Sequence, residues 1–262
     1  MEHVFDTPCF KELTLTAAQP DLNIRVCENT HVKLIVSYAG IGAMRQSHIE
    51  LEPGSSLVIL MKNMDVKENQ LTQDAIVQRD ASLTIAYWEI DEGKTDIDLH
   101  VSLTSEGSSC TIKSATIAQE HKNFKMECVH ETAYTSSLME NYAIVKDGGN
   151  FYMEATGKIV KGAHDSASHQ ATRVLTLSEN HNSEVLPVLL IDENDVKASH
   201  ATTLGQPDEN QLYYLQSRGL SRAQALGLLT VGYLMPISEL FDDEQYREFM
   251  KDEIEKKVGL HA

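Results

Sequence analysis

The sequence predicts a mainly β protein, a parallel β-helix (solenoid) that is followed by a C-terminal α-helical region. Apolar and polar residues alternate in short bursts between about residues 22 and 204, which is the pattern of half-buried strands. Turn-and-strand segments that begin at Cys27, Leu51, Val77 and Thr104 resemble one another and start 24, 26 and 27 residues apart. This spacing is about that of one solenoid coil. A β-sandwich gives similar alternation and is the alternative on pattern alone.

Each strand of the predicted solenoid shows a period of two. Leu57, Ile59 and Met61 share one face of the segment LVILM, for example. Turn-forming stretches such as EPGSS, QRDAS, SEGSS and DENDV separate the strands, and no helix-length pattern interrupts them. The alternating strands and helices of a Rossmann or TIM fold are therefore excluded, and we expect residues 1–204 to form one β-helix core domain.

Helical patterns begin after residue 205, and we expect residues 205–262 to form a separate helical domain. Asp208 can cap a first helix, DENQLYYLQSR, which should stop at Gly219. Ser221 can cap a second helix, SRAQALGLLTVGYL, which Pro236 should end. One face of this second helix carries Leu226, Leu229 and Tyr233.

A third, acidic helix is predicted to open at Ser238 with the sequence SELFDDEQYREFMKDEIEKK. Gly259 is placed as its C-terminal stop. A solenoid needs a cover on its open end, and this helical tail could supply one. It could equally be a docking surface for a partner.

Charge and hydropathy exclude several classes of partner. The chain has 22 Lys+Arg against 39 Asp+Glu and a net charge of -17, which disfavours nucleic acid because binding to phosphates needs clustered basic residues. No apolar run approaches the roughly 18 residues of a membrane span, and residues 1–30 lack a signal-peptide pattern. We therefore expect a cytoplasmic protein that binds neither nucleic acid nor membrane.

The four cysteines, Cys9, Cys27, Cys110 and Cys128, form no C-x-x-C motif. A thioredoxin-type redox pair and a sequence-local zinc site are therefore not indicated. We expect reduced thiols that act as small apolar core residues.

No catalytic or nucleotide-binding motif is visible. The sequence lacks a Walker A loop, a G-x-G-x-x-G and a G-x-S-x-G, so we do not expect an enzyme. What remains near the end of the strand region is a set of imidazole and carboxylate groups, which can hold a metal such as iron or zinc. The candidate ligands are His181, Glu184 and His200.

One stretch resembles a known family. The chain carries SHATT from Ser199 to Thr203, followed by GQPDENQLYYLQSRG from Gly205 to Gly219. This pattern is similar to the C-terminal signature of the SufB/SufD family, scaffold proteins of iron–sulfur cluster assembly. The match is specific over roughly residues 185–235, whereas upstream it depends on strand pattern alone.

The resemblance implies a right-handed parallel β-helix with a C-terminal helical domain and no catalytic activity of its own. Family members pair through their last β-helix strands, which places Val196, Ala198 and His200 at a dimer interface. Their C-terminal helices dock the ABC-type ATPase SufC. The docking residues implied are Asp208, Glu209, Gln211, Tyr213, Tyr214, Leu215, Ser217, Arg218 and Gly219.

The resemblance also implies a ligand position at the pairing interface. The histidine of the SufD-type motif falls on His200, whereas a SufB-type cysteine position falls on His181 and is therefore not a thiol here. With Glu184 nearby, the chain would contribute ligands for transient iron or an iron–sulfur cluster, completed by a second copy or by a SufB-like paralogue. The family's N-terminal helical domain is expected to be absent, since strand alternation starts near residue 22. Two rival functions are a urease-accessory-like β-helix metallochaperone and a β-helix carbohydrate-active enzyme.

Overall fold

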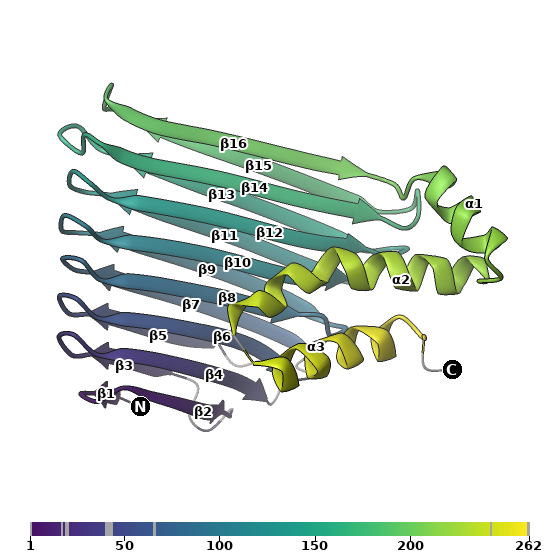
Figure 1. The fold of residues 1–262 in the computed structure, drawn as a ribbon, viewed down its shortest axis with the longest axis horizontal. Helices are drawn as coiled ribbons and strands as arrows, with labels where there is room; N and C mark the ends of the chain where they lie inside the picture. Colours follow the sequence, from purple (N-terminus) through teal and green to yellow (C-terminus); the bar gives the residue numbers. More distant parts are fainter. Residues whose placement is uncertain are drawn as a thin grey trace.

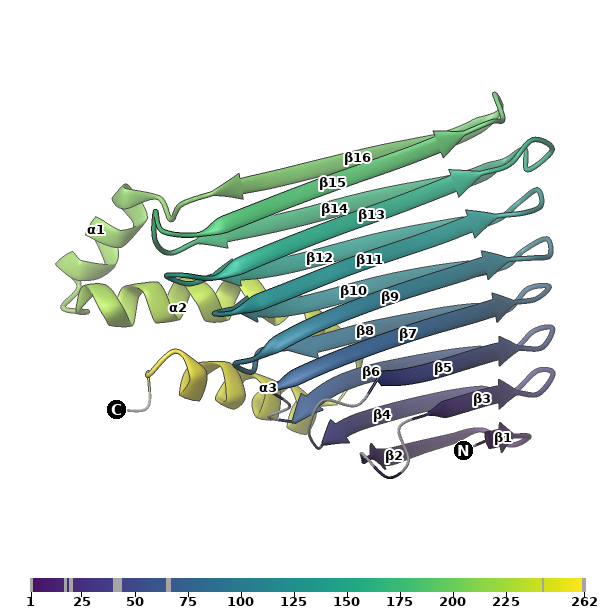
Figure 2. The ribbon, with the colours of Figure 1, turned by 180° about the vertical axis from the view of Figure 1, so that it is seen from behind.

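Successive strands lie alternately in two parallel sheets (Figures 1 and 2). The structure is a computed structural model that describes residues 2–16, 18, 21–39, 44–64, 67–241 and 243–260. Within these residues each sheet has eight strands; we call them the odd sheet and the even sheet after the strand numbers. The odd sheet consists of β1 (Glu2–Phe5), β3 (Leu22–Val26), β5 (Met44–Leu51), β7 (Glu68–Val77), β9 (Lys94–Leu103), β11 (His121–His130), β13 (Asn150–Ile159) and β15 (Asn182–Ile191). The even sheet consists of β2 (Cys9–Leu15), β4 (His31–Ala39), β6 (Ser56–Met64), β8 (Ser82–Glu89), β10 (Ser109–Ala118), β12 (Ser136–Val145), β14 (Ser166–Thr176) and β16 (Val196–Gly205).

Each strand pairs in parallel with the strand two places earlier, so that two strands make one coil of a solenoid. Ser56 lies opposite Ser82, and Ser109 lies opposite Ser82 on the other side, which reproduces the spacing of 26 to 27 residues read from the sequence. The predicted β-helix is confirmed. The sandwich alternative is excluded because a sandwich is built from antiparallel strands.

The core is built from inward-facing columns of side chains that stack from coil to coil. One column in the even sheet runs through Leu34, Ile59, Ile85, Ile112 and Met139, which lie opposite one another in register. All five side chains are fully buried. Such stacking removes apolar surface from water at every coil and is the main source of stability in a solenoid.

The turns at one end of the coils also stack. Asn29, Gly54, Asp80, Gly107 and Tyr134 all adopt positive φ angles, between 54° and 76°. In all five, the backbone N–H donates a hydrogen bond to a carbonyl in the next turn, with N···O distances of 2.8 to 3.1 Å. Regular coils therefore require one left-handed residue per turn, which Gly, Asn and Asp adopt at least cost.

The first two helices follow the predicted boundaries. α1 (Glu209–Ser217) is capped by Asp208, whose side chain accepts a hydrogen bond from the N–H of Asn210. α2 (Arg222–Leu234) begins with a capping box between Ser221 and Gln224. Gly219 has a φ of 97° and follows α1 as its stop. Pro236 lies just after the end of α2.

The predicted start of the third helix is wrong. Met235–Leu240 form a 3-10 helix, η1, within which the Ser238 hydroxyl donates to the carbonyl of Met235 at 2.7 Å. α3 (Glu244–Lys257) begins only after Asp243 caps it, and residue 242, inside the predicted helix, lies outside the described residues. The reason is Pro236, which starts a tight turn of its own and so delays the next α-helix. The predicted stop at Gly259, with a φ of 73°, is confirmed.

The predicted apolar face of α2 is only half-buried. The helix instead turns its small residue Gly227 toward the chain that follows α3, and a Cβ there would lie 2.9 Å from Leu260 Cγ. Close approach of two segments thus sets the orientation of the helix, a constraint that periodicity does not reveal. The half-buried residues are Leu226, Leu229 and Tyr233, and the buried ones include Ala225, Gly227, Val231 and Leu234.

The helices cover the outer face of the even sheet, whereas the described chain places no helix over the odd sheet (Figures 1 and 2). Beneath them lies a second hydrophobic cluster, formed by outward-facing strand residues and helix residues. None of the described helices is long and apolar enough to cross a membrane. The buried members of the second cluster include Ile35, Leu60, Ala86, Trp88, Val231, Leu234, Ile237, Phe241, Met250 and Ile254.

Candidate functional site

The last coil of the solenoid is open. β15 and β16 are the terminal strands of the two sheets, and each pairs with a described neighbour on one side only. Most of β16 is exposed. The helices cover earlier strands of the even sheet and leave this edge bare (Figure 1). Unpaired edge strands of this length are ready partners for another chain.

His200 lies at the mouth of the solenoid interior. It pairs with Gln170 of β14, which is 4% exposed and whose Nε2 donates to the carbonyl of Val188 in β15 at 3.0 Å. Neighbours in register point to the same face, so His200 continues an interior column past its last buried member. Val196 and Ala198 lie opposite the buried Ser166 and Ser168 and share this face. The three predicted interface residues therefore lie together on the inward face of the open strand.

Glu184 and His181 lie elsewhere. Ser183 is paired with the buried Phe151, so Glu184, the next residue, is on the outer face of the odd sheet, opposite Tyr152. His181 precedes β15, and its Nδ1 lies 2.9 Å from Ser183 Oγ. Among the described residues, no three or more His, Cys, Asp or Glu side chains are placed to hold a metal ion. One chain thus does not gather the three candidate ligands into a metal site.

The interior near the open end is polar, which the sequence reading did not anticipate. The fully buried His130 has its Nδ1 2.7 Å from Thr135 Oγ1 and its Nε2 2.8 Å from Ser137 Oγ. Ser137 Oγ donates in turn to Ser168 Oγ at 3.0 Å, one coil further on. Burial lowers the pKa of His130 to about 4, so the ring is neutral at pH 7. The signal that could have found this group is the inward register of His130 at the end of the alternating segment HKNFKMECVH.

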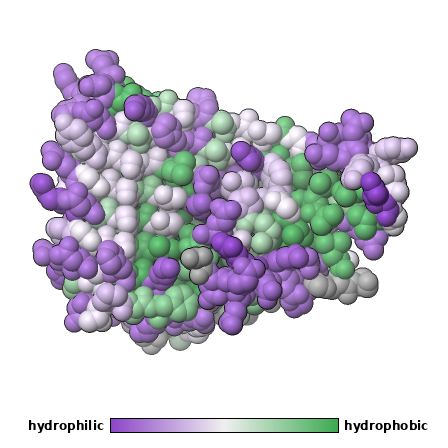
Figure 3. Space-filling model, in the orientation of Figure 1, coloured by the Kyte–Doolittle hydropathy of each residue, from purple (hydrophilic) through white to green (hydrophobic). Residues whose placement is uncertain are grey.

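On α1, the predicted docking residues have different roles. Tyr213 and Tyr214 are 75% and 57% exposed, and the Arg218 guanidinium lies 5.2 Å from the Tyr214 ring centroid. Glu209 pairs with Arg222 at 2.8 Å, and this hydrogen bond lowers the pKa of the carboxyl group. In Figure 3 hydrophobic surface lies over α2 and, as a separate band, over the sheet beside the helices, whereas α1 is mostly hydrophilic.

The other predicted residues of this segment are mainly structural. Asp208 caps α1 and Gly219 ends it, as described above, and the Ser217 hydroxyl donates to the carbonyl of Tyr214 at 2.7 Å. Leu215 is half-buried. Gln211 lines a cleft of about 220 Å³ between the ends of β14 and β16 and the first two helices. The cleft is lined by Val174, Leu175, Thr203, Gly205, Gln206, Pro207, Asp208, Gln211, Leu229 and Tyr233.

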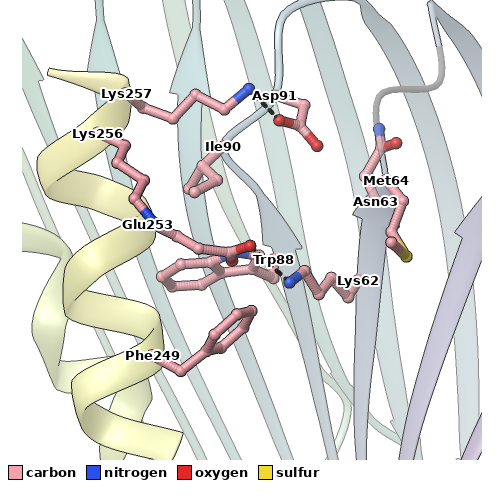
Figure 4. Close-up of a pocket in the computed structure, with 10 residues that line it drawn as sticks. All are labelled: Lys62, Asn63, Met64, Trp88, Ile90, Asp91, Phe249, Glu253, Lys256 and Lys257. Atoms are coloured by element: carbon pink, nitrogen blue, oxygen red, sulfur yellow. Dashed lines mark hydrogen bonds and ion pairs between the residues drawn. The ribbon is translucent and has the colours of Figure 1, made fainter. Parts of the chain in front are cut away.

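A second cavity, of about 230 Å³, lies between α3 and the even sheet (Figure 4). Lys62 Nζ is 2.7 Å from Glu253 Oε1, and the Trp88 indole N–H donates to Glu253 Oε2 at 3.0 Å. Lys257 forms an ion pair with Asp91. Because these two lysines already face carboxylates, the cavity is a packing seam rather than a charged binding site.

Comparison with known proteins adds a family match. The sequence model described as "SUF system FeS cluster assembly, SufBD core domain" matches residues 10–233. The iron–sulfur cluster assembly protein SufD of Bacillus subtilis (strain 168) is 31% identical over 182 residues, which are 69% of this chain and 42% of that protein.

More distant relatives give the same family. The SufB protein of Bacillus subtilis (strain 168) is 22% identical over 171 residues, which cover 64% of this chain and 34% of that protein. An iron–sulfur cluster assembly SufBD family protein of Mycobacterium leprae (strain TN) is 30% identical over 141 residues, which cover 53% of this chain and 16% of that protein. The chain thus spans less than half the length of each of these relatives.

Proposed function

Because the chain belongs to the SufBD family of the SUF iron–sulfur cluster assembly system, we propose that it is a non-enzymatic scaffold subunit that works with a SufC-like ABC-type ATPase. The observation that carries the proposal is the bare, open last coil with His200 on its inward face. Family membership favours this function over a urease-accessory-like metallochaperone and over a carbohydrate-active enzyme. We place the complex in the cytoplasm, without nucleic-acid or membrane partners.

The two ends of the solenoid support pairing through the last coil alone. At the first coil, Lys11 of β2 lies opposite the buried Leu34 and so takes an inward position on the edge strand. A charge at such a position opposes edge-to-edge association. At the last coil, the inward residues Val196, Ala198 and His200 carry no fixed charge. Because only the last coil can pair with another chain, two subunits form a closed dimer rather than a growing filament.

In the proposed pair, His200 contributes a ligand for iron or for a cluster that is the cargo of the complex. Neutral imidazole ligates iron, but most clusters are held by thiolates, and no cysteine lies in β15 or β16. Completion of the site therefore falls to the partner, either a second copy or a SufB-like paralogue with a cysteine. His181 and Glu184 would join only through contacts that the partner provides.

The ATPase would dock on α1 and α2. Exposed aromatic residues and arginine dominate binding energy at protein interfaces, and Tyr213, Tyr214 and Arg218 are such residues. The neighbouring cleft could take an apolar side chain of the partner. Nucleotide-driven movement of the ATPase would then reach the open coil through β16, to which α1 is joined by residues 206–208.

Pairing is tested by placing a charge on each face of β16. Ala198→Arg puts the charge on the inward face, whereas Ala201→Arg puts it on the opposite face of the same strand. Both positions are exposed in one chain, so neither change should impair folding. We expect Ala198→Arg to weaken the pair at least 100-fold in sedimentation equilibrium and Ala201→Arg to change it much less. A wild-type protein that stays monomeric, with and without a SufB-like partner, would contradict the proposal.

The ligand role is tested with His200→Ala in the assembled complex, reconstituted with iron and sulfide. We expect iron retention to fall at least several-fold. His169→Ala is the matched control, because His169 lies on the adjacent strand with its Nδ1 2.7 Å from Ser199 Oγ on the outer face. Equal retention by wild type and His200→Ala would remove the ligand role while leaving the pairing experiment unaffected.

Docking is tested by binding of the purified ABC ATPase to a Tyr213→Ala/Tyr214→Ala double variant. Loss of two exposed aromatic anchors should weaken binding by a factor of about 30 or more. The Tyr213→Phe/Tyr214→Phe variant keeps both rings and should retain most of the affinity. Undiminished binding by the alanine variant would place the ATPase on another surface.

A further inference from the structure

The outer face of the odd sheet carries a row of alternating imidazole and carboxylate groups. Registered pairing places His48 of β5, Asp74 of β7, His100 of β9 and Glu127 of β11 next to one another. The residue that follows each of them along its strand points inward and is at most 1% exposed, so the row faces outward. These inward neighbours are Ile49, Ala75, Val101 and Cys128.

The spacing and the chemistry of this row suit a transition metal. Neighbouring strands lie about 4.8 Å apart, so two histidines flank one aspartate at equal distances along the row. Imidazole nitrogen and carboxylate oxygen are ligands of zinc and of iron(II), at about 2.0 to 2.2 Å from zinc. No lysine or arginine interrupts the row from His48 to Glu127 to compete for the carboxylates.

Glu127 already orients one candidate ligand. Its Oε2 lies 2.8 Å from His100 Nδ1, so the ring can donate its Nδ1–H to the carboxylate and keep the Nε2 lone pair available. A metal-bound histidine usually donates its other ring N–H to a carboxylate in this way, which fixes the ring's orientation. The contact between His100 Nε2 and Ser102 Oγ is long, at 3.4 Å, and therefore weak. A metal ion bound to Nε2 would replace it.

The other two groups are available. His48 and Asp74 are exposed, and neither makes a hydrogen bond or ion pair within the described part of the chain. We propose that His48, Asp74 and His100 bind one divalent transition-metal ion, with Glu127 orienting His100 and with one coordination position open to water or to a ligand. Among the described residues these side chains do not converge on one point, so binding requires His48 and Asp74 to turn toward His100. This site lies on the opposite sheet from His200 and does not depend on the proposed scaffold function.

The experiment is a titration of metal-free protein with Co²⁺, followed by its visible absorption bands and by calorimetry, in a His200→Ala background. We expect one ion per chain and displacement of Co²⁺ by Zn²⁺. His48→Ala or His100→Ala should weaken binding at least 100-fold, and Glu127→Gln should weaken it 10- to 100-fold because the histidine loses its orienting group.

His121→Ala is the matched control, because His121 is another partly exposed histidine of the odd sheet, on β11, and lies outside the row. It should bind Co²⁺ as the background protein does. Binding by His48→Ala with unchanged affinity, or no stoichiometric binding by the His200→Ala protein, would overturn the proposal. Failure of this titration leaves the pairing and ATPase experiments unaffected.

Discussion

At the scale of single residues, the buried His130 makes the stability of the protein depend on pH. Its folded-state pKa of about 4 lies below the ordinary value of 6.5 because the charged ring would lose its hydration. Between these two values the unfolded chain binds a proton that the folded chain does not. This contribution to stability is therefore complete above about pH 6.5 and is lost as the pH falls toward 4.

Between about pH 6.5 and pH 4, protonation of His130 in the unfolded chain should lower the free energy of unfolding by at most about 3 kcal/mol. Urea unfolding at pH values from 7 to 4.5 measures the loss. His130→Asn should be less stable at pH 7 but should show a flatter dependence on pH. His31 is exposed, so His31→Asn should keep the wild-type dependence of the free energy of unfolding on pH. If His31→Asn flattened this dependence as much as His130→Asn does, the pH effect could not be assigned to His130.

At the scale of elements, the stacked turns predict unequal costs for two glycines. Gly107 and Gly148 both have positive φ angles, of 76° and 73°. A Cβ at Gly107 would lie 2.0 Å from Asp80 Oδ1, whereas a Cβ at Gly148 would meet no atom within 4 Å. Gly148→Ala should therefore lower the free energy of unfolding through backbone strain alone, by about 1 to 2 kcal/mol.

Gly107→Ala should cost about 1 kcal/mol or more beyond its control, because the Asp80 side chain must also move. Thermal and denaturant unfolding of the two variants gives the comparison directly. The double variant Asp80→Ala/Gly107→Ala should recover part of the difference. Equal losses for Gly107→Ala and Gly148→Ala would show that the turns do not stack as tightly as described.

Regular elements could be predicted from the sequence, because each coil repeats one pattern of inward apolar residues and left-handed turns. Interactions between distant elements could not. Glu89 and Lys122, both fully buried, form an ion pair 3.2 Å long although they are 33 residues apart and lie in different sheets. No local pattern marks such a pair.

The same limit applied to the candidate site. The sequence placed His200 near Glu184, and they are close in the chain. Because successive side chains of a strand point to opposite faces, Glu184 lies on the outer face of the odd sheet and His200 on the inward face of the even sheet. Which face a residue takes depends on the register of its strand, and a shift of one residue reverses it.

At the scale of the whole molecule, α3 returns to the first coils. Tyr246 Oη donates to Glu12 Oε1 of β2 at 2.7 Å, and the Phe10 ring packs edge-on against those of Phe241 and Tyr246. The helix also covers Trp88, the only tryptophan of the chain. Trp88 fluorescence therefore reports whether α3 is docked.

Ile254→Ala removes a fully buried contact of α3 with the even sheet. We expect a loss of about 2 to 4 kcal/mol and a red shift of the Trp88 emission at lower denaturant concentration than in wild type. Lys251→Ala, at an exposed position of the same helix, should stay within about 0.5 kcal/mol. An unchanged Trp88 transition in Ile254→Ala would mean that α3 does not shield the indole.

The return of α3 has a consequence for biosynthesis. Trp88 leaves the ribosome 165 residues before its hydrogen-bond partner Glu253, which at roughly 5 to 20 residues per second is a delay of roughly 8 to 33 s. Until α3 emerges, Ile35, Leu60 and Trp88 form an exposed apolar patch, first on a growing and then on a finished stack of coils. Nascent chains should therefore be clients of ribosome-associated chaperones until the final helix emerges, and a stop codon before α3 should yield chains that aggregate although their coils are intact.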